Sequence, residues 1–217
     1  MTKITALEVQ KKNPRRVNIY LDGEFAFALA RITAAWLKVG DELNPDKILQ
    51  LQDREAREQA WQQAAFFLSF RPRSESEIRQ NLRKHKISEP VIEHTLERLR
   101  QTRLAGDGDF ARAWVENRTT FRPRGRRALE SELRLKGLDQ TTIQAALADV
   151  DEDSLAYQAA LRKALRFQGL DWLEFRKKLS DFLARRGFPY AVLAPVVKSV
   201  WDEMQSQEKI SEDKDLT

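Results

Sequence analysis

The stretch Phe70-Arg71-Pro72-Arg73 occurs a second time as Phe121-Arg122-Pro123-Arg124, 51 residues further along the chain. Each proline predicts the end of a helix, because the residue before a proline is pushed out of the α conformation. A four-residue phrase at this spacing suggests a repeat. A true repeat requires that the residues after each copy also match.

Six apolar residues follow each copy in the same register, and a third set follows after a further step of 50 residues, without the phrase. The first set is Ile78, Leu82, Ile87, Ile92, Leu96 and Leu99; the second is Leu129, Leu133, Leu138, Ile143, Leu147 and Val150; the third is Leu179, Leu183, Phe188, Leu193, Val197 and Val200. A period of about 50 residues is typical of tandem helical units, each of which buries its apolar face partly against a neighbour.

Local signals predict where helices of these units begin and end. An apolar stripe predicts a first helix over about 56–70. Ser74 and Glu77 have the spacing of a capping box, which predicts the start of a second helix, and Ser88 predicts the start of a third. In the second unit, Asp107 is expected to cap the first helix, and Gly137 to end the second.

Residues 1–50 have a different pattern. Large apolar residues recur at every second position at 17–21 and at 25–29, and Asp22-Gly23 lies between the two runs, which predicts a β-hairpin. A third strand is expected near 5–9, because an isolated hairpin is only marginally stable. Asn44-Pro45 then predicts a helix start.

The sequence therefore predicts a mainly α fold, with three tandem three-helix repeats in an elongated curved array behind a small N-terminal β element. The predicted segments are a β element and linker helix at 1–50, repeats at 51–104, 105–151 and 152–204, and a disordered acidic tail at 205–217.

Composition narrows the class of protein. The chain has 38 basic and 33 acidic residues and no cysteine, so disulfides, thiol catalysis and cysteine-bound zinc are excluded. We expect a cytoplasmic protein, because the N-terminus lacks a signal-peptide pattern and no apolar run approaches the roughly 18 residues that a membrane span needs. A basic body with an acidic end favours a polyanionic partner or an acidic protein surface.

Motifs for enzyme chemistry are absent from the sequence. Its two histidines, His85 and His94, form no metal-binding motif, and there is no nucleophile elbow or phosphate-binding glycine loop. We expect no catalytic residue, no metal site and no cofactor.

Basic residues gather at related places in successive repeats. These clusters can be interpreted either as ordinary solvated charge or as a binding surface. The latter is favoured because the clusters recur and arginine, which makes forked contacts to carboxylate or phosphate, dominates the strongest one. The candidate partner-binding or nucleic-acid-binding residues are Arg71, Arg73, Arg118, Arg122, Arg124, Arg126, Arg127, Arg134, Lys136, Arg176, Lys177, Lys178, Arg185 and Arg186.

Arg118 lies on a mostly apolar face, four residues after Trp114 and three before Phe121. Its stem could simply cover the edge of the core. Alternatively, its guanidinium orders the FRPR turn or reaches a partner. The sequence leaves both interpretations open.

Several of these stretches resemble those of the RecX family, regulators of the RecA recombinase. The matching residues are Arg73-Ser74-x-x-Glu77, Phe110-Ala111-x-x-Trp114-x-x-x-Arg118, Gly125, Leu129-x-x-x-Leu133-x-x-Lys136-Gly137 and Leu183-Ala184-Arg185-Arg186-Gly187-Phe188. The resemblance covers about 50–204. One departure is Gly106-Asp107, which stands where the family usually has two aspartates, so no special role is carried over to Gly106.

The resemblance implies three-helix repeats, and a monomeric protein that binds in the groove of the RecA–single-stranded DNA filament and modulates, mostly inhibits, RecA. It brings no cofactor and no catalytic residue. A second class remains open from the residues alone: a general nucleic-acid-binding helical protein, similar to helix-turn-helix regulators, that acts without RecA.

Overall fold

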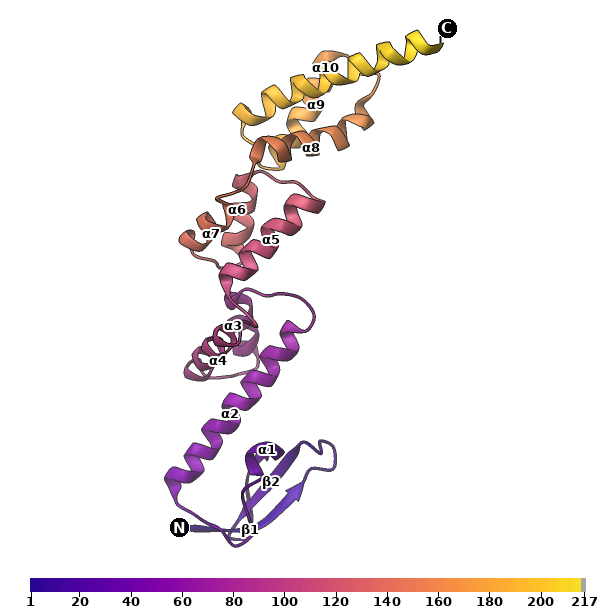
Figure 1. Cartoon of the computed structure of the whole chain (residues 1–217). Coiled ribbons are helices and arrows are strands. Elements are labelled where there is room, and N and C mark those ends of the chain that lie inside the picture. Colours follow the sequence, from indigo (N-terminus) through magenta and orange to yellow (C-terminus); the bar gives the residue numbers. More distant parts are fainter. Residues whose placement is uncertain (216–217) are drawn as a thin grey trace. The chain divides into compact units, whose positions relative to one another are not determined.

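The structure, a computed structural model, describes residues 1–215, with side chains described through Gln207. Figure 1 shows a small β element followed by helices grouped in threes. The elements are β1 Thr2–Val9, β2 Arg16–Leu21, β3 Glu24–Ala30, α1 Arg31–Ala34, β4 Glu42–Leu43, α2 Pro45–Leu68, α3 Glu75–Lys84, α4 Glu89–Gln101, α5 Asp107–Phe121, α6 Arg126–Leu135, α7 Gln140–Leu147, α8 Glu152–Ala164, the 3₁₀ turn η1 Leu165–Phe167, α9 Trp172–Arg185 and α10 Tyr190–Asp215. The predicted class, three three-helix repeats with an N-terminal sheet, is confirmed.

The N-terminal sheet is antiparallel, with strand order β3-β2-β1-β4. The predicted hairpin turns at Asp22 and Gly23, which have φ values of 50° and 92°. Such positive values are the reason why this dipeptide favours tight hairpins. The third strand is present as β1, and the short edge strand β4 carried too weak an alternation to be predicted.

Helix α2 is longer than predicted. It begins at Pro45, with Asn44 accepting a hydrogen bond from the Lys47 backbone N–H, and continues without a break to Leu68. Its first half buries Leu51 against the sheet, and its second half buries Ala64 in the core of the first repeat. The predicted linker helix and the first repeat helix are therefore one helix with two apolar patches, separated by a polar middle.

The helix ends follow their local signals with two exceptions. Ser74 and Glu77 form the full capping box, and Gly137 adopts a φ of 83° after α6. Ser88 is the N-cap of α4, but its side chain makes no capping hydrogen bond. The prediction for Asp107 is wrong: Gly106 occupies the N-cap of α5, and Asp107 is the first helical residue, where its charge favours the helix dipole.

The chain divides into two compact units, Met1–Ala105 and Gly106–Thr217. In the first unit, the sheet and the first repeat have separate apolar clusters. In the second unit, one cluster runs from Phe110 to Val200 and takes residues from both remaining repeats. The second and third repeats therefore share one core, whereas the periodic pattern predicted only that each unit buries its apolar face partly against a neighbour.

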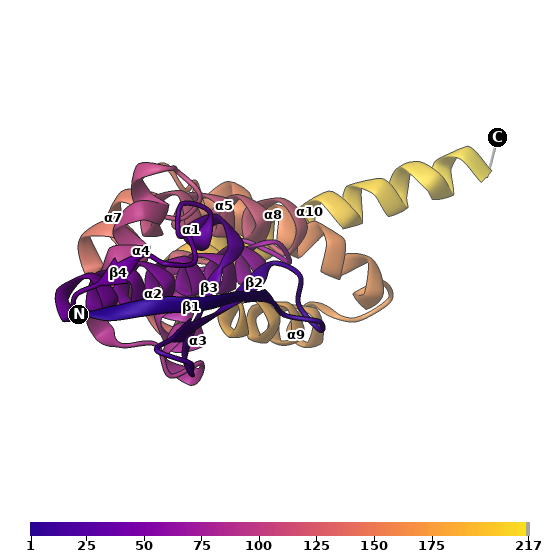
Figure 2. The same ribbon diagram turned by 90° about the horizontal axis from the view of Figure 1, so that it is seen from below.

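The prediction of a disordered tail from residue 205 is corrected by the structure. Helix α10 continues to Asp215 and projects past α8 and α9, as Figures 1 and 2 both show. Its sequence after Val200 is rich in residues that favour helices, and Lys198 forms an ion pair with Asp202 one turn further on. The last two residues of the predicted tail lie outside the described residues.

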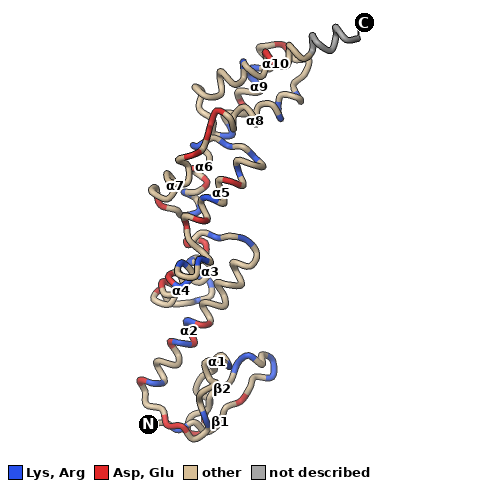
Figure 3. The backbone as a smooth tube through the Cα atoms, in the orientation of Figure 1, with Lys and Arg blue, Asp and Glu red and all other residues tan. Residues whose placement is uncertain are grey.

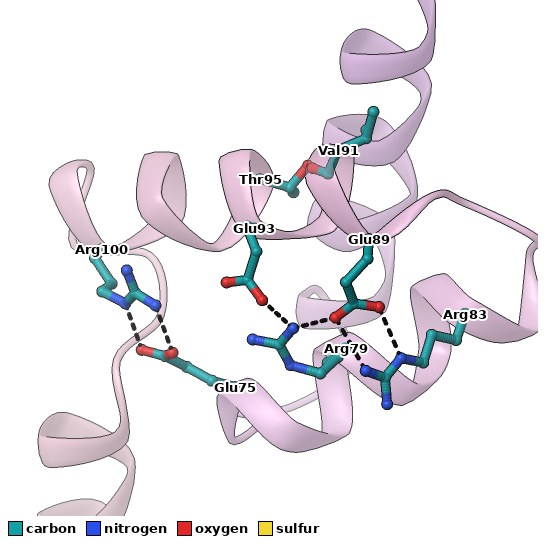
Figure 4. Close-up of polar contacts among 8 residues, drawn as sticks. All are labelled: Glu75, Arg79, Arg83, Glu89, Val91, Glu93, Thr95 and Arg100. Atoms are coloured by element: carbon teal, nitrogen blue, oxygen red, sulfur yellow. Dashed lines mark hydrogen bonds and ion pairs between the residues drawn. The ribbon is translucent and has the colours of Figure 1, made fainter.

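In the first unit, ion pairs join α3 to α4 (Figure 4). Arg79 bridges Glu89 and Glu93, and Arg83 donates to the two Glu89 carboxylate oxygens at 2.9 and 3.0 Å. At the other end, Arg100 makes a forked pair with Glu75. These arginines neutralise acids within the repeat, which makes this face a weak candidate for anion binding.

This network predicts an acid-sensitive first repeat. The hydrogen bond from Arg83 lowers the pKa of Glu89 below its ordinary 4.5, and the hydrogen bond from Arg79 does the same for Glu93. Because the folded-state pKa values are lowered, the stabilisation is present above pH 4.5 and is lost as the pH falls through the folded-state values. Urea unfolding of the Arg79→Gln/Arg83→Gln variant should show a smaller loss of stability between pH 6 and about pH 3 than the parent. An equal loss in both proteins would contradict this role.

Candidate partner-binding surface

The second FRPR copy forms a rigid turn between α5 and α6. Pro123 is buried, and its carbonyl oxygen accepts a hydrogen bond of 3.0 Å from Arg186 Nη1. The Gly125 backbone N–H donates to the Arg186 carbonyl oxygen at 2.9 Å. A Cβ on Gly125 would lie 2.4 Å from the Gly187 carbonyl oxygen, so only glycine allows this approach. The turn is thereby joined to the α9–α10 link.

A second connection runs from this turn to the α7–α8 link and the first turn of α8, which together carry acids at 149, 151, 152 and 153 (red in Figure 3). The Arg126 backbone N–H donates to Glu152 at 2.8 Å. The Arg126 guanidinium donates to the carbonyl oxygens of Ala148 and Val150 at 3.1 and 2.7 Å. The Arg126 side chain therefore makes hydrogen bonds within the second unit.

Glu132 organises two more of the candidate arginines. Its Oε2 accepts hydrogen bonds of 2.8 Å from Arg118 Nε and from the indole N–H of Trp114, and its Oε1 forms an ion pair of 2.5 Å with Arg124. The Arg118 guanidinium also stacks on the Trp114 ring at 4.3 Å. Of the two interpretations of Arg118, the structure supports the one in which it orders the FRPR turn, through Glu132.

The first FRPR copy is held differently, within its own unit. Arg71 makes a forked pair with Glu77, the acid of the capping box, at 2.8 and 3.2 Å. The Arg73 guanidinium lies 4.1 Å above the Phe67 ring, and its Nε is buried without a hydrogen-bond partner among the described residues. Both arginines contact residues of their own repeat, and the charge of Arg71 is balanced by Glu77.

The other candidates divide into engaged and exposed side chains. Arg134 pairs with Glu130, Lys178 pairs with Glu174, and Lys136 lies over the Trp114 ring. Five candidates are exposed and make no side-chain hydrogen bond or ion pair within the described part of the chain: Arg122, Arg127, Arg176, Lys177 and Arg185. These five are the candidate residues best able to meet a partner.

The sequence analysis missed three cations of the second unit. Arg162 and Lys163 at the end of α8, and Arg166 in η1, lie near Arg186 and line the same hollow. Their signal was present as a basic run, Arg162-Lys163-x-x-Arg166, but it falls between apolar stripe positions and has no counterpart in the other repeats. Burial lowers the pKa of Arg186, and the neighbouring Arg124, Arg122 and Arg162 lower it further, as expected where cations outnumber acids.

Four models of one family match the chain in consecutive segments. The regulatory protein RecX N-terminal domain matches residues 2–44, and the first, second and third three-helix domains of RecX match 60–99, 107–147 and 151–194. The chain belongs to the RecX family. The N-terminal match covers the sheet, and each of the other three matches falls on one of the three helical groups, although the first of them begins inside α2 and the last ends inside α10.

Relatives of known name agree with this assignment. The regulatory protein RecX of Bacillus subtilis is 32% identical over 205 residues, which cover 92% of this chain and 78% of that protein. The RecX of Bacillus pumilus is 31% identical, covering 96% of this chain and 81% of that protein. A crystal structure of a regulatory protein RecX has a TM-score of 0.68 and 27% identity, covering 90% of this chain and all of that one.

No helix in the described part of this RecX family member is long and apolar enough to cross a membrane.

The contacts separate exposed arginines from arginines that hold the turn, in a testable way. Arg122→Ala/Arg127→Ala should change the free energy of unfolding by no more than about 0.5 kcal/mol, because both side chains are exposed. Arg126→Ala should cost about 1 kcal/mol, because the carbonyl groups of Ala148 and Val150 lose their donor. Urea denaturation measures both values. Equal losses in the two variants would contradict this division.

Proposed function

We propose that this chain is a non-enzymatic regulator of the RecA recombinase, acting in the cytoplasm as a monomer in recombination and the SOS response. It binds in the groove of the RecA–single-stranded DNA filament and modulates, mostly inhibits, ATP hydrolysis and strand exchange. The observation that carries the proposal is membership of the RecX regulatory family across the sheet and all three helical domains.

The exposed cations fit this role physically. Arg122, Arg127 and Arg185 in the second unit present guanidinium groups that can make forked contacts to carboxylates of RecA or to DNA phosphates. An occupant of the filament groove needs such contacts more than it needs a catalytic group.

Purified protein added to RecA on single-stranded DNA provides the test. We expect ATP hydrolysis and strand exchange to fall as the chain approaches stoichiometric amounts, and Arg122→Glu/Arg127→Glu to weaken the effect. Unchanged ATP hydrolysis and strand exchange with the parent chain at stoichiometric amounts would overturn the proposal.

The alternative is a nucleic-acid-binding protein that acts without RecA, and the same unpaired cations favour it. The salt dependence of binding distinguishes these two functions. Binding to bare DNA should weaken steeply with salt, with a slope set by the number of phosphates neutralised. A RecA regulator should bind filaments far better than bare DNA at the same salt concentration.

A further inference from the structure

A hollow of about 270 Å³ lies in the second unit, between the FRPR turn, α8 and α9. Its lining residues are Phe121, Pro123, Ala159, Arg162, Lys163, Arg166, Phe182 and Arg186. Four of the eight are basic and none is acidic. We call this set the basic hollow.

The four cations of the basic hollow have no neutralising acid within the described residues. Arg162, Lys163, Arg166 and Arg186 form no ion pair with any acid in the described part of the chain. This contrasts with α3 and α4, where arginines and glutamates pair almost completely. Like charges held close together raise the free energy of the empty site, so an anion gains more there than at an isolated surface arginine.

The two aromatic rings of the hollow differ in whether their faces are already covered by cations. Phe182 has Lys163 at 5.5 Å and Arg186 at 4.6 Å from its ring centroid, so cations already cover it. Phe121 begins the FRPR phrase and is 70% exposed, and it has no ring or cation partner among the described residues. An exposed ring beside unpaired cations is the combination that binds single-stranded nucleic acid, in which bases stack and phosphates are neutralised.

We propose that the basic hollow is a direct contact site for single-stranded nucleic acid. One backbone phosphate lies among Arg162, Arg166 and Arg186, and an adjacent base stacks on Phe121. Arg186 is fixed in place by its bond to the Pro123 carbonyl oxygen, so this guanidinium is already positioned. The inference rests on the proposed function, which brings the chain to a strand, and it adds the residues that would touch that strand.

The experiment measures binding of the full chain, without RecA, to a short fluorescein-labelled oligothymidylate. Phe121→Ala should weaken binding roughly 5- to 150-fold, and Phe121→Trp should restore it, because one stacked base contributes about 1–3 kcal/mol. Arg162→Glu/Arg166→Glu should weaken binding and make it less dependent on salt, with the slope falling by about 0.7 for each phosphate that is no longer neutralised. The matched control is Arg54→Glu/Lys84→Glu, the same charge change at exposed residues of the first unit.

Three results would overturn the site. The first is that the Phe121→Ala and Arg162→Glu/Arg166→Glu variants bind as tightly as the parent. The second is that the Arg54→Glu/Lys84→Glu control weakens binding as much as Arg162→Glu/Arg166→Glu does. The third is that the parent binds a duplex of the same length as tightly as the single strand. Displacement of the oligothymidylate by polyglutamate at lower concentration than by unlabelled strand would assign the hollow to an acidic protein segment instead. RecA ATP hydrolysis is followed in parallel with each variant. If the chain regulates RecA but its oligonucleotide binding does not depend on the hollow, this site alone is overturned. If oligonucleotide binding depends on the hollow but the chain does not affect RecA, the proposed function alone is overturned.

Discussion

Leu133→Ala is expected to lower the free energy of unfolding of the second unit by about 2–5 kcal/mol. Leu133 is completely buried in the cluster that the second and third repeats share. Truncation removes buried methyl groups and leaves a cavity that close-packed neighbours fill only in part. The destabilisation should affect both repeats, because both contribute residues to the same apolar core.

Urea denaturation followed by circular dichroism measures the change, and hydrogen exchange shows which unit opens. The matched control is Leu135→Ala in the same helix, where the side chain is 85% exposed and the expected change is within about 0.5 kcal/mol. Similar losses of stability in the two variants would contradict the shared core. So would faster exchange in α5–α7 with α8–α10 unchanged.

Gly125→Ala is expected to destabilise the second unit by about 1–3 kcal/mol or more. The new Cβ would lie 2.4 Å from the Gly187 carbonyl oxygen and 2.7 Å from the Phe188 backbone nitrogen. Because these are backbone atoms, the α9–α10 link must move, which also strains the hydrogen bond from Gly125 to Arg186. Exchange should therefore rise first in the α9–α10 link.

Gly108→Ala provides the control for this substitution. The nearest atom to its added Cβ is the end of the Arg112 side chain at 3.8 Å, an ordinary contact, and the residue lies in α5. Alanine in place of a helical glycine should stabilise by about 0.5–1 kcal/mol. A Gly125→Ala protein as stable as the parent would show that the close approach is not required.

The two copies of FRPR explain which parts of the fold could be predicted from sequence. After the first copy, Ser74 caps the next helix through a residue three positions away, a local contact that spacing reveals. After the second copy, Gly125 stands at the same place and allows contact with a backbone 62 residues away. Sequence periodicity predicts that neighbouring repeats pack together but not which residues meet, so this contact between the second and third repeats was not predicted.

Core positions were predicted well for a similar reason. Seventeen of the eighteen repeat positions are buried, and Ile87 packs half-buried against its cluster. Helical periodicity records which residues face inward, whatever the neighbouring repeat is. By contrast, α2 was predicted as two helices because its polar middle, 52–54, interrupts the stripe while the helix changes neighbours.

The candidate site was predicted only in outline. Sequence identified the basic turn, but it did not separate Arg124 and Arg126, which hold the turn, from Arg122 and Arg127, which are exposed. That separation depends on Glu132 and on carbonyl groups of the α7–α8 link. Charge counting along a chain cannot show which acids reach which arginines in space.

Co-sedimentation of the chain with RecA on single-stranded DNA tests the central claim most directly. It is done at a salt concentration at which the chain no longer sediments with the bare DNA. We predict saturable recovery of the chain in the pellet with RecA filaments, reduced by Arg122→Glu/Arg127→Glu. A chain that stays in the supernatant with filaments, as it does with bare DNA, would contradict its assignment as a regulator that binds the RecA filament.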